Sequence, residues 1–389
     1  MTNAHTLTDI SGNKALFMES LGIGLIGTGF MGKAHALAYR NARAVLGGLP
    51  RVRLEQLCDT PLAQAAAFAD QFGFARHTEN WRDLVNDPAI HIISITAPNH
   101  LHRDIALAAI GAGKHVWCEK PLSITLQDAT EMADAAQQAG VKTMVGYNYI
   151  HNPAITHARH LIDAGTIGDI VHFRGWVDED YQADPTLPWT WRARRADAGL
   201  GVLGDLACHL VSLATTLNGP IASLIADTQT VHKTRPLPDG SGHGSVENED
   251  TASALVHFAN GVHGTLAASR TAWGRKSRLD WELHGTRGML TFAQERMNEL
   301  RLYVNEGPMA TQGFRTILTG PEHAPYGAFC PAPGHQLGFN DLKVIELGAF
   351  LNAIQNNTRP YPDFAAALKF EQVIHAMDRS AGSGHRISL

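Results

Sequence analysis

Two short segments in the first part of the chain carry polar side chains where they could do chemistry. Glu119, Lys120 and Pro121 directly follow the apolar run 115–118, which is typical of a buried strand. A lysine held between a carboxylate and a proline at such a strand end is hard to explain as solvated surface. The simpler interpretation is a turn with a local Glu–Lys ion pair. Residues 96–102, Thr-Ala-Pro-Asn-His-Leu-His, follow another apolar run in the same way.

Asp205 and His209 form a third candidate group, in the second half of the chain. They stand four residues apart in the segment 202–217, which has the apolar pattern of a helix, so both project from one helix face. The simpler interpretation is a carboxylate at the helix start and a core histidine. A metal pair is a further alternative, but no third or fourth ligand stands at a convincing spacing, and we expect no metal.

Three glycines near the start of the chain indicate a ligand. Gly27, Gly29 and Gly32 make a GxGxxG between a short apolar strand, 23–26, and a helix-prone segment, 33–40. Gly27 permits a tight turn, Gly29 lets the backbone approach a pyrophosphate, and Gly32 lets the helix pack on the strand. The helix N-terminus adds free N–H groups for the anion. The pattern predicts a dinucleotide site, against the alternative of a plain strand–helix turn.

Asp59 refines this prediction, because it ends the second expected strand, 52–58. A carboxylate there accepts hydrogen bonds from both ribose hydroxyls of the adenosine half and repels a 2′-phosphate. No Arg or Lys follows directly to attract that phosphate, so we expect NAD rather than NADP. The spacing from the glycines is longer than usual, which we attribute to a loop at 45–50. Asp59 could instead, or in addition, cap the helix after Pro61.

The composition is that of an ordinary globular protein. The 389 residues can hold two domains, and 44% apolar and 18% charged residues are typical values. A formal net charge of −5 with mixed signs argues against nucleic acid or an anionic membrane as a partner. The longest apolar runs are shorter than a membrane span, and the N-terminus lacks the pattern of an export signal. The 4 cysteines are far apart and form no CxxC, which favours a reduced, cytoplasmic protein.

Strand and helix patterns divide the chain into two domains. Continuous apolar strands joined by helices predict an α/β Rossmann domain, a doubly wound parallel sheet, over residues 21–148. Alternating strands with fewer helices predict an α+β domain with a large, mainly antiparallel sheet over 149–389. We expect residues 1–20 to form an arm, and 233–248, rich in Pro, Gly and His, to form a mobile loop. A large one-sided sheet often packs on another subunit, so we expect a homo-oligomer, either a dimer or a homotetramer.

The motifs and their order resemble the glucose-fructose oxidoreductase / inositol dehydrogenase (Gfo/Idh/MocA) family. The resemblance spans nearly the whole chain beyond residue 20. Five motifs carry it, at 27–32, 96–102, 119–121, 146–153 and 204–209. It continues in His-Gly-Thr-Arg-Gly, which ends at residue 288, and in Gly-Phe-Asn-Asp-Leu-Lys-Val-Ile-Glu, which ends at residue 346.

This resemblance implies an NAD-dependent oxidoreductase that takes a hydride from a CH–OH group of a small polyhydroxylated ring, a sugar or cyclitol. His209 would be the general base, Lys120 would stabilise the charge on the substrate oxygen, and Asp205 would orient the substrate or the base. The cofactor residues would be Gly27, Gly29, Phe30, Met31, Asp59, Thr96, Pro98, Asn99, His102, Glu119, Lys120 and Asn148, with Glu119 and Asn148 on the nicotinamide ribose. The substrate residues would be Lys120, Asn148, Trp176, Asp178, Trp191, Arg192, Asp205, His209 and His335.

Two segments, 181–192 and 313–323, resemble family members that act on levoglucosan, and so favour a pyranose. Scyllo-inositol, myo-inositol and glucose are the alternative substrates. Two other classes of function are an NAD-using glycoside hydrolase and a non-catalytic dinucleotide sensor. The sensor would be expected to have lost Lys120 and His209, which this chain retains.

The segment 313–335 has no clear strand or helix pattern and holds Pro, Gly and aromatic residues. Long loops inside compact domains are commonly binding loops or lids. We therefore expect His323, Tyr326 or His335 to close over the sugar, in their own subunit or in a neighbouring one.

Overall fold

The first domain is a doubly wound α/β unit, as expected. The computed structural model describes residues 20–389, so the expected arm lies outside the described residues except for Ser20. Six parallel strands form the sheet in the order β3-β2-β1-β4-β5-β6, which opens a crevice beyond the carboxyl ends of β1 and β4. The strands are β1 (Ser20–Ile26), β2 (Arg51–Cys58), β3 (Arg76–Thr78), β4 (Ile92–Ile95), β5 (His115–Cys118) and β6 (Thr143–Val145).

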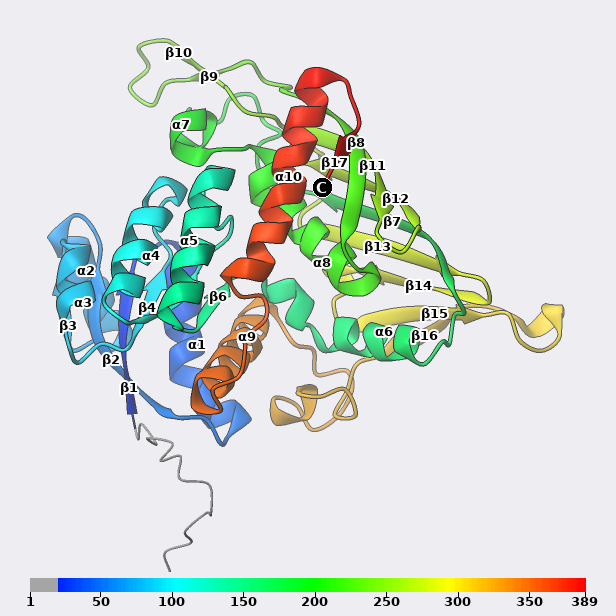
Figure 1. Ribbon diagram of the computed structural model, residues 1–389, viewed down its shortest axis with the longest axis horizontal. Coiled ribbons are helices and arrows are strands. Elements are labelled where there is room, and N and C mark those ends of the chain that lie inside the picture. Colours follow the sequence, from blue (N-terminus) through cyan, green and yellow to red (C-terminus); the bar gives the residue numbers. More distant parts are fainter. Residues whose placement is uncertain (1–19) are drawn as a thin grey trace, which may run out of the picture.

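Helices connect these strands (Figure 1). Three of them, α1, α2 and α5, have a glycine as the C-cap. Gly73 and Gly140 close α2 and α5 in the left-handed conformation, with φ of 75° and 67°. The first helix runs on to Leu46, so the loop before β2 is shorter than the expected 45–50. The helices are α1 (Phe30–Leu46), α2 (Leu62–Phe72), α3 (Trp81–Asn86), α4 (His102–Gly111) and α5 (Leu126–Ala139).

The second domain is built on a nine-stranded sheet in the order β16-β15-β14-β13-β7-β12-β11-β8-β17. All neighbours are antiparallel except β7 and β12, so the sheet is mixed but mainly antiparallel. Its strands are β7 (Ile170–Asp178), β8 (Ile221–Gln229), β11 (Thr251–Phe258), β12 (His263–Ser269), β13 (Arg278–Gly285), β14 (Gly288–Ala293), β15 (Glu299–Val304), β16 (Arg315–Leu318) and β17 (Ile387–Ser388).

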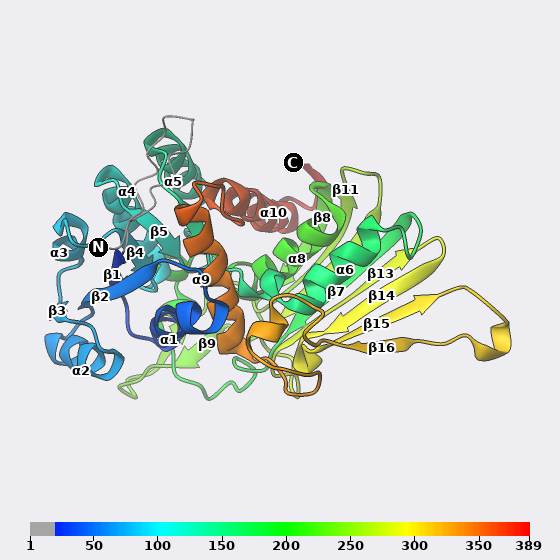
Figure 2. The ribbon, with the colours of Figure 1, turned by 90° about the horizontal axis from the view of Figure 1, so that it is seen from below.

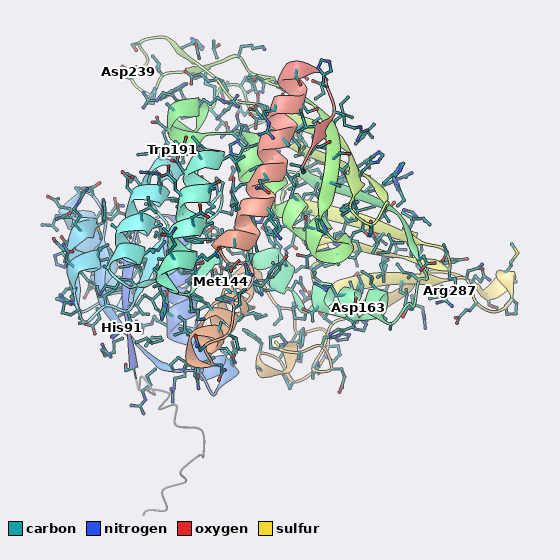
Figure 3. The ribbon with its side chains drawn as sticks, viewed as in Figure 1. His91, Met144, Asp163, Trp191, Asp239 and Arg287 are labelled. Carbon is teal, nitrogen blue, oxygen red and sulfur yellow. The ribbon has the colours of Figure 1, made fainter. Side chains whose placement is uncertain are left out.

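The expected mobile loop at 233–248 is instead a small hairpin of β9 (Thr234–Pro236) and β10 (His243–Ser245). Its tip carries Asp239, labelled in Figure 3. The buried guanidinium of Arg235 donates to the backbone carbonyls of Gln182 and Asp184 over 2.6 and 2.8 Å, and so ties the hairpin to the body of the domain. Local composition did not reveal this long-range anchor.

Helices α6 (Pro153–Asp163), α8 (Cys208–Asn218) and α10 (Phe364–Ser383) lie against one face of the large sheet (Figure 2). A short helix, α7 (Arg195–Ala198), precedes α8. The stretch Arg195–Asn218 is long and apolar enough to cross a membrane, but 83% of its most apolar window is buried inside the protein. It therefore has the environment of a core helix.

Helix α9 (Phe339–Gln355) returns from the second part of the sequence to the first domain. It packs along α1, and its buried Leu347 and Phe350 share one core with Tyr39 and Trp117. The expected domain boundary at 148/149 therefore divides the two sheets between the two parts of the sequence. It does not divide the cores in this way, because residues of α9 belong to the core of the first domain. This return matters for the site, because Phe339 at the start of α9 lines the main cleft.

Candidate active site

A cleft of about 740 Å³ lies beyond the carboxyl ends of β1, β4 and β5, and residues of both domains line it. Trp191, which Figure 3 labels beside α7, belongs to its second-domain wall. The cleft brings together these residues that the sequence nominated: Gly27, Gly29, Phe30, Met31, Asp59, Thr96, Pro98, Asn99, His102, Glu119, Lys120, Asn148, Trp191, Arg192, Asp205 and His209. Among the described residues 20–389, three predicted substrate residues do not line this cleft: Trp176, Asp178 and His335.

The three glycines have the local geometry that a pyrophosphate site requires. Gly27 has a φ of 98°, which side chains rarely tolerate. A Cβ on Gly32 would collide with the carbonyl oxygen of Gly27, whereas a Cβ on Gly29 would meet open space. Gly29 is also the N-cap of α1 and offers no side chain to its amides. The turn thus leaves room and N–H groups for a phosphate, so these residues fit a dinucleotide.

Asp59 is fixed at the edge of the same turn. Its Oδ2 accepts a hydrogen bond from the Thr28 amide over 2.8 Å and another from the Thr28 hydroxyl, while Oδ1 accepts from the Thr60 amide over 2.7 Å. The N-cap of α2 is Pro61, with no side-chain cap, so Asp59 does not cap that helix. A carboxylate oxygen has more than one lone pair, so the ribose hydroxyls can still be accepted.

Lys120 pairs with Asp205 across the two domains, and not with the neighbouring Glu119. Its Nζ lies 2.8 Å from Asp205 Oδ1 and donates over 2.7 Å to the Asp205 carbonyl oxygen. The Tyr181 hydroxyl donates to the other carboxylate oxygen, Oδ2, over 2.5 Å. The sequence did not nominate Tyr181, although it begins one of the segments quoted for the resemblance.

The charges of this pair are stabilised by each other. Burial by itself would raise the pKa of Asp205, but Lys120 and Tyr181 hold it well below its usual range. Burial by itself would lower the pKa of Lys120, but Asp205 outweighs it and raises the pKa. At neutral pH the site therefore holds an ammonium and a carboxylate, and the ammonium can donate a hydrogen bond to a substrate oxygen.

His209 lies next to this pair, in the first turn of α8. Leu203–Ala207 form a π turn before α8, so the expected regular helix over 202–217 is interrupted at Asp205. The His209 ring is buried with Tyr147 and Tyr149 at its edges, at centroid distances of 5.8 and 4.7 Å. Burial and Lys120 hold its pKa well below 6.5. The ring also lines the cleft, so a neutral imidazole is available to a ligand there as a proton acceptor.

Glu119 and Asn148 line the cleft on the side of the first sheet. Glu119 Oε1 accepts a hydrogen bond from Lys343 Nζ over 2.6 Å and contacts His35 Nε2 at 2.9 Å. Asn148 is buried, and its side-chain amide nitrogen has no partner in the described part of the chain. A buried amide donor without a partner is costly, which fits a position that a ligand hydroxyl completes.

Asn99 and His102 have structural contacts that the sequence did not reveal. Asn99 Nδ2 donates to the Ala198 carbonyl over 3.1 Å and so links the first domain to α7. The buried His102 ring lies between two backbone carbonyls, 3.0 Å from that of Pro121 and 3.0 Å from that of Ala97. Each ring nitrogen of His102 faces a carbonyl oxygen, and in the neutral ring only one of them carries the N–H that can donate, so His102 shapes the cleft wall.

Trp176 and Asp178 are on the wrong face of β7 to contact a substrate in this cleft. A Cβ on Gly175 would meet Leu210 of α8, so Gly175 faces the helices and its neighbour Trp176 faces away. On that outer face, Arg278 stacks over Trp176 at 5.3 Å and pairs with Asp178 at 2.9 Å. The prediction of these two residues as sugar contacts in this cleft was wrong. Side chains alternate between the two faces of a strand, and this alternation places Trp176 and Asp178 on the face of β7 that points away from the helices.

The segment 313–335 does not form the expected lid over the cleft of its own chain. It contains strand β16 and a helical turn at Tyr326–Ala328. Tyr326 is fully buried and packs with Leu337 and Leu342, while His323 lies against His157 at 4.5 Å. His335 is exposed and away from the cleft lining, so a contact with a sugar could only come through a neighbouring subunit.

The cleft also includes polar side chains that sequence reasoning missed. They are Thr28, Tyr149, Glu179, Tyr181, Gln182, Thr190, Arg270 and Ser277. Burial, and the nearby Asp205, raise the pKa of Glu179 to about 7. Over the described residues, no group of three or more His, Cys, Asp or Glu side chains is placed to hold a metal ion.

The fold and the cleft together define a two-domain, NAD-binding oxidoreductase. Residues 21–147 match the family model of the oxidoreductase family with an NAD-binding Rossmann fold, and residues 155–291 match the GFO/IDH/MocA C-terminal domain. The chain belongs to the GFO/IDH/MocA oxidoreductase family.

Three relatives mark its place in the family. Levoglucosan dehydrogenase of Pseudarthrobacter phenanthrenivorans is 37% identical over 94% of this chain and 97% of its own length. A solved structure of levoglucosan dehydrogenase in complex with NADH and levoglucosan has a TM-score of 0.92 at 37% identity, covering 95% of this chain and 99% of the other. Scyllo-inositol 2-dehydrogenase (NAD(+)) of Bacillus subtilis is 26% identical over 87% of this chain and 90% of its own length.

Proposed function

We propose that this protein oxidises a secondary ring hydroxyl of a sugar to the ketone, with a levoglucosan-like pyranose as the favoured substrate. The observation that carries the proposal is the Lys120–Asp205 pair beside a buried, neutral His209 in the cofactor cleft. The 37% identity to levoglucosan dehydrogenase supports the choice of a pyranose. An inositol is the alternative substrate, in view of the likeness to scyllo-inositol 2-dehydrogenase.

The groups in the cleft suit this reaction. A ring nitrogen of His209 accepts the proton of the substrate hydroxyl, while the carbon that bears this hydroxyl loses a hydride. Lys120 donates a hydrogen bond to the oxygen and stabilises its developing negative charge, and Asp205 keeps Lys120 charged and in place. NAD, when bound, supplies the hydride acceptor. Asn148 and Glu119 would hold its nicotinamide ribose.

The second-domain wall of the cleft offers surfaces for a sugar ring. Arg192 stacks over Trp191 at 4.6 Å, and both line the cleft. The indole face can lie on the C–H face of a pyranose, while Arg192, Glu179 and Gln182 can bond its hydroxyls. These residues are our proposed sugar contacts, in place of Trp176 and Asp178.

A substrate panel tests the proposal. NADH formation should be measured with levoglucosan, D- and L-glucose, myo-inositol and scyllo-inositol, and we expect the highest kcat/KM with levoglucosan. K120A and H209A should each lower kcat roughly 10²–10⁴-fold, with NAD binding retained in fluorescence quenching. An inositol preference would overturn the choice of substrate, and near-normal turnover in either variant would remove that residue from the mechanism. Substrate cleavage without net NADH release would favour the glycoside hydrolase.

The quaternary structure and the cellular compartment also belong to this proposal. The face of the large sheet opposite its helices carries Leu255, which is 55% exposed, in one cross-strand row with Thr265, Arg174 and Glu282. Such a face suits contact with a second subunit, so we propose a dimer or tetramer in the cytoplasm. Light scattering after size-exclusion chromatography measures the number of subunits, and a monomer at micromolar concentration would contradict it.

A further inference from the structure

Four titratable side chains form a buried cluster behind the cofactor side of the cleft. They are His35 on α1, Glu119 after β5, and Lys343 and Glu346 on α9, and each is at most 5% exposed. Only Glu119 also lines the cleft. The cluster thus joins the cofactor site of the first domain to α9, whose Lys343 lies 224 residues after Glu119 in the chain.

Lys343 is the centre of this cluster. Its Nζ lies 2.6 Å from Glu119 Oε1 and 3.3 Å from Glu346 Oε2, and it also reaches the Gly146 carbonyl at 3.4 Å. The indole of Trp117 donates to Glu346 Oε1 over 2.6 Å and holds that carboxyl in turn. The ammonium is therefore fixed from two sides, with Glu119 as its shortest contact.

The charges show why the ammonium is needed. Burial would raise the pKa of Glu119, but Lys343 and His35 hold it below its usual range. Burial lowers the pKa of His35 to about 4, so His35 is neutral at physiological pH. Lys343 stays protonated, because Glu119 and Glu346 outweigh the effect of burial on its pKa. Lys343 is thus the cation that keeps a buried Glu119 ionised.

The geometry of Glu119 leaves one oxygen for a ligand. Lys343 and His35 both contact Oε1, whereas Oε2 accepts only a weak hydrogen bond from the Lys120 amide at 3.3 Å. A Cβ at Gly146 would collide with the carboxylate, so the glycine gives the side chain its space. Glu119 is consequently held at one oxygen while it lines the cleft.

We propose that Lys343 is a positioning residue for the cofactor: it holds Glu119 by Oε1, so that an ionised Oε2 is presented to the nicotinamide ribose. Glu346 anchors Lys343 from the other side. The inference rests on the proposed role of Glu119 at that ribose. It adds that part of the NAD affinity is set by α9, through a residue that does not itself line the cleft.

A double-mutant cycle on the full-length protein tests this inference. The variants are K343M, E119Q and K343M/E119Q, and the measurements are the Kd of NAD by fluorescence quenching, the KM for NAD, kcat and Tm. K343M and E119Q should each weaken NAD binding about 10-fold or more, which is the effect of losing one hydrogen bond to a charged group. The double variant should bind NAD no more weakly than E119Q alone, since Lys343 acts through Glu119.

A matched control separates positioning from stability. Lys114 is also buried in the first domain, and its Nζ donates to the carbonyls of Asp87 and Ile90 over 2.7 and 2.6 Å, away from the cleft. K114M should lower Tm and leave the Kd of NAD unchanged. K343R, which keeps a cation, should recover part of the affinity lost in K343M.

The outcomes distinguish this inference from the proposed function. If E119Q leaves NAD binding unchanged, Glu119 does not hold the ribose, and the proposed cofactor contact fails. If E119Q weakens binding but K343M does not, or if the two losses add in the double variant, the inference about Lys343 is overturned. Should K343M not fold, E346Q keeps Lys343 and removes the negative charge of one of its two carboxylate partners. It should raise the KM for NAD more than it lowers kcat, and an unchanged KM would contradict the inference.

Discussion

The Tyr181 hydroxyl donates to Asp205 Oδ2 over 2.5 Å, while Asp205 Oδ1 lies 2.8 Å from Lys120 Nζ. One carboxylate therefore joins a side chain of the first domain to one that follows strand β7 of the second. This contact explains how Lys120 can be both charged and immobile at a cleft between two domains. It also makes Tyr181 a positioning residue that the sequence motifs do not reveal.

Y181F should impair turnover by loosening Asp205. Removing a hydrogen bond to a charged group is worth about 1.5–3 kcal/mol, so we expect a fall of about 10–100-fold in kcat/KM for the sugar. The Kd of NAD should change little. Y326F is the matched control, because the Tyr326 hydroxyl lies 3.3 Å from the Ala332 carbonyl in a separate core cluster. Equal effects of both variants on kcat/KM would show that Tyr181 has no special role.

The pH dependence of oxidation should report the low pKa of His209. The base accepts a proton only when neutral, and the neutral form prevails above its pKa, which burial and Lys120 hold well below 6.5. We expect kcat/KM for oxidation to rise with pH along a limb whose midpoint lies below 6.5. The profile of E179Q should be measured beside it, because the pKa of Glu179 is raised to about 7. A wild-type midpoint above 6.5 that persists in E179Q would contradict the assignment.

Asp59 should decide the choice between NAD and NADP. D59A removes the carboxylate that repels a 2′-phosphate and that accepts the Thr28 amide at 2.8 Å. The ratio of kcat/KM for NAD to that for NADP should fall, and it should fall further in D59A/T60R, which adds a cation. D59N keeps an acceptor for Thr28 and separates the loss of charge from the loss of loop geometry. A wild-type enzyme that used NADP equally well would show that Asp59 does not contact the ribose.

Glu371 should make the stability of the protein depend on pH. Its carboxyl is fully buried, Oε1 accepts a hydrogen bond from the Leu122 amide, and burial raises the pKa from 4.5 to about 8. Between these values the folded state binds more protons than the unfolded state, so stability falls as the pH rises from about 4.5 to about 8. E371Q has no such ionisation, so its Tm relative to wild type should be higher at pH 9 than at pH 5. A Tm difference that stays constant over this range would contradict the ionisation of Glu371.

The sequence by itself determined the element types and the ligand class of the first domain. Gly27, Gly29 and Gly32 have local requirements, a positive φ or a missing Cβ, that act within one turn and are therefore visible in the chain. Apolar runs of strand length separated by helices likewise indicate a parallel sheet. Polar residues that follow the strands then line the crevice at the carboxyl ends of these strands. The motif at Glu119–Pro121 could be placed in the cleft for this reason.

The tertiary structure decided how these residues are paired. Lys120 pairs with Asp205, and Glu119 pairs with Lys343, across sequence separations of 85 and 224 residues. No local sequence pattern predicts contacts over such separations. The same applies to the four histidines His257, His263, His172 and His284, which β11, β12, β7 and β13 bring into one row. Trp176 and Tyr326 have side chains that suit a sugar. However, Trp176 lies on the face of β7 that points away from the helices, and Tyr326 is buried in a separate core cluster. Side-chain chemistry can be read from the chain, whereas the face on which a side chain lies and the partner it meets depend on packing between distant elements.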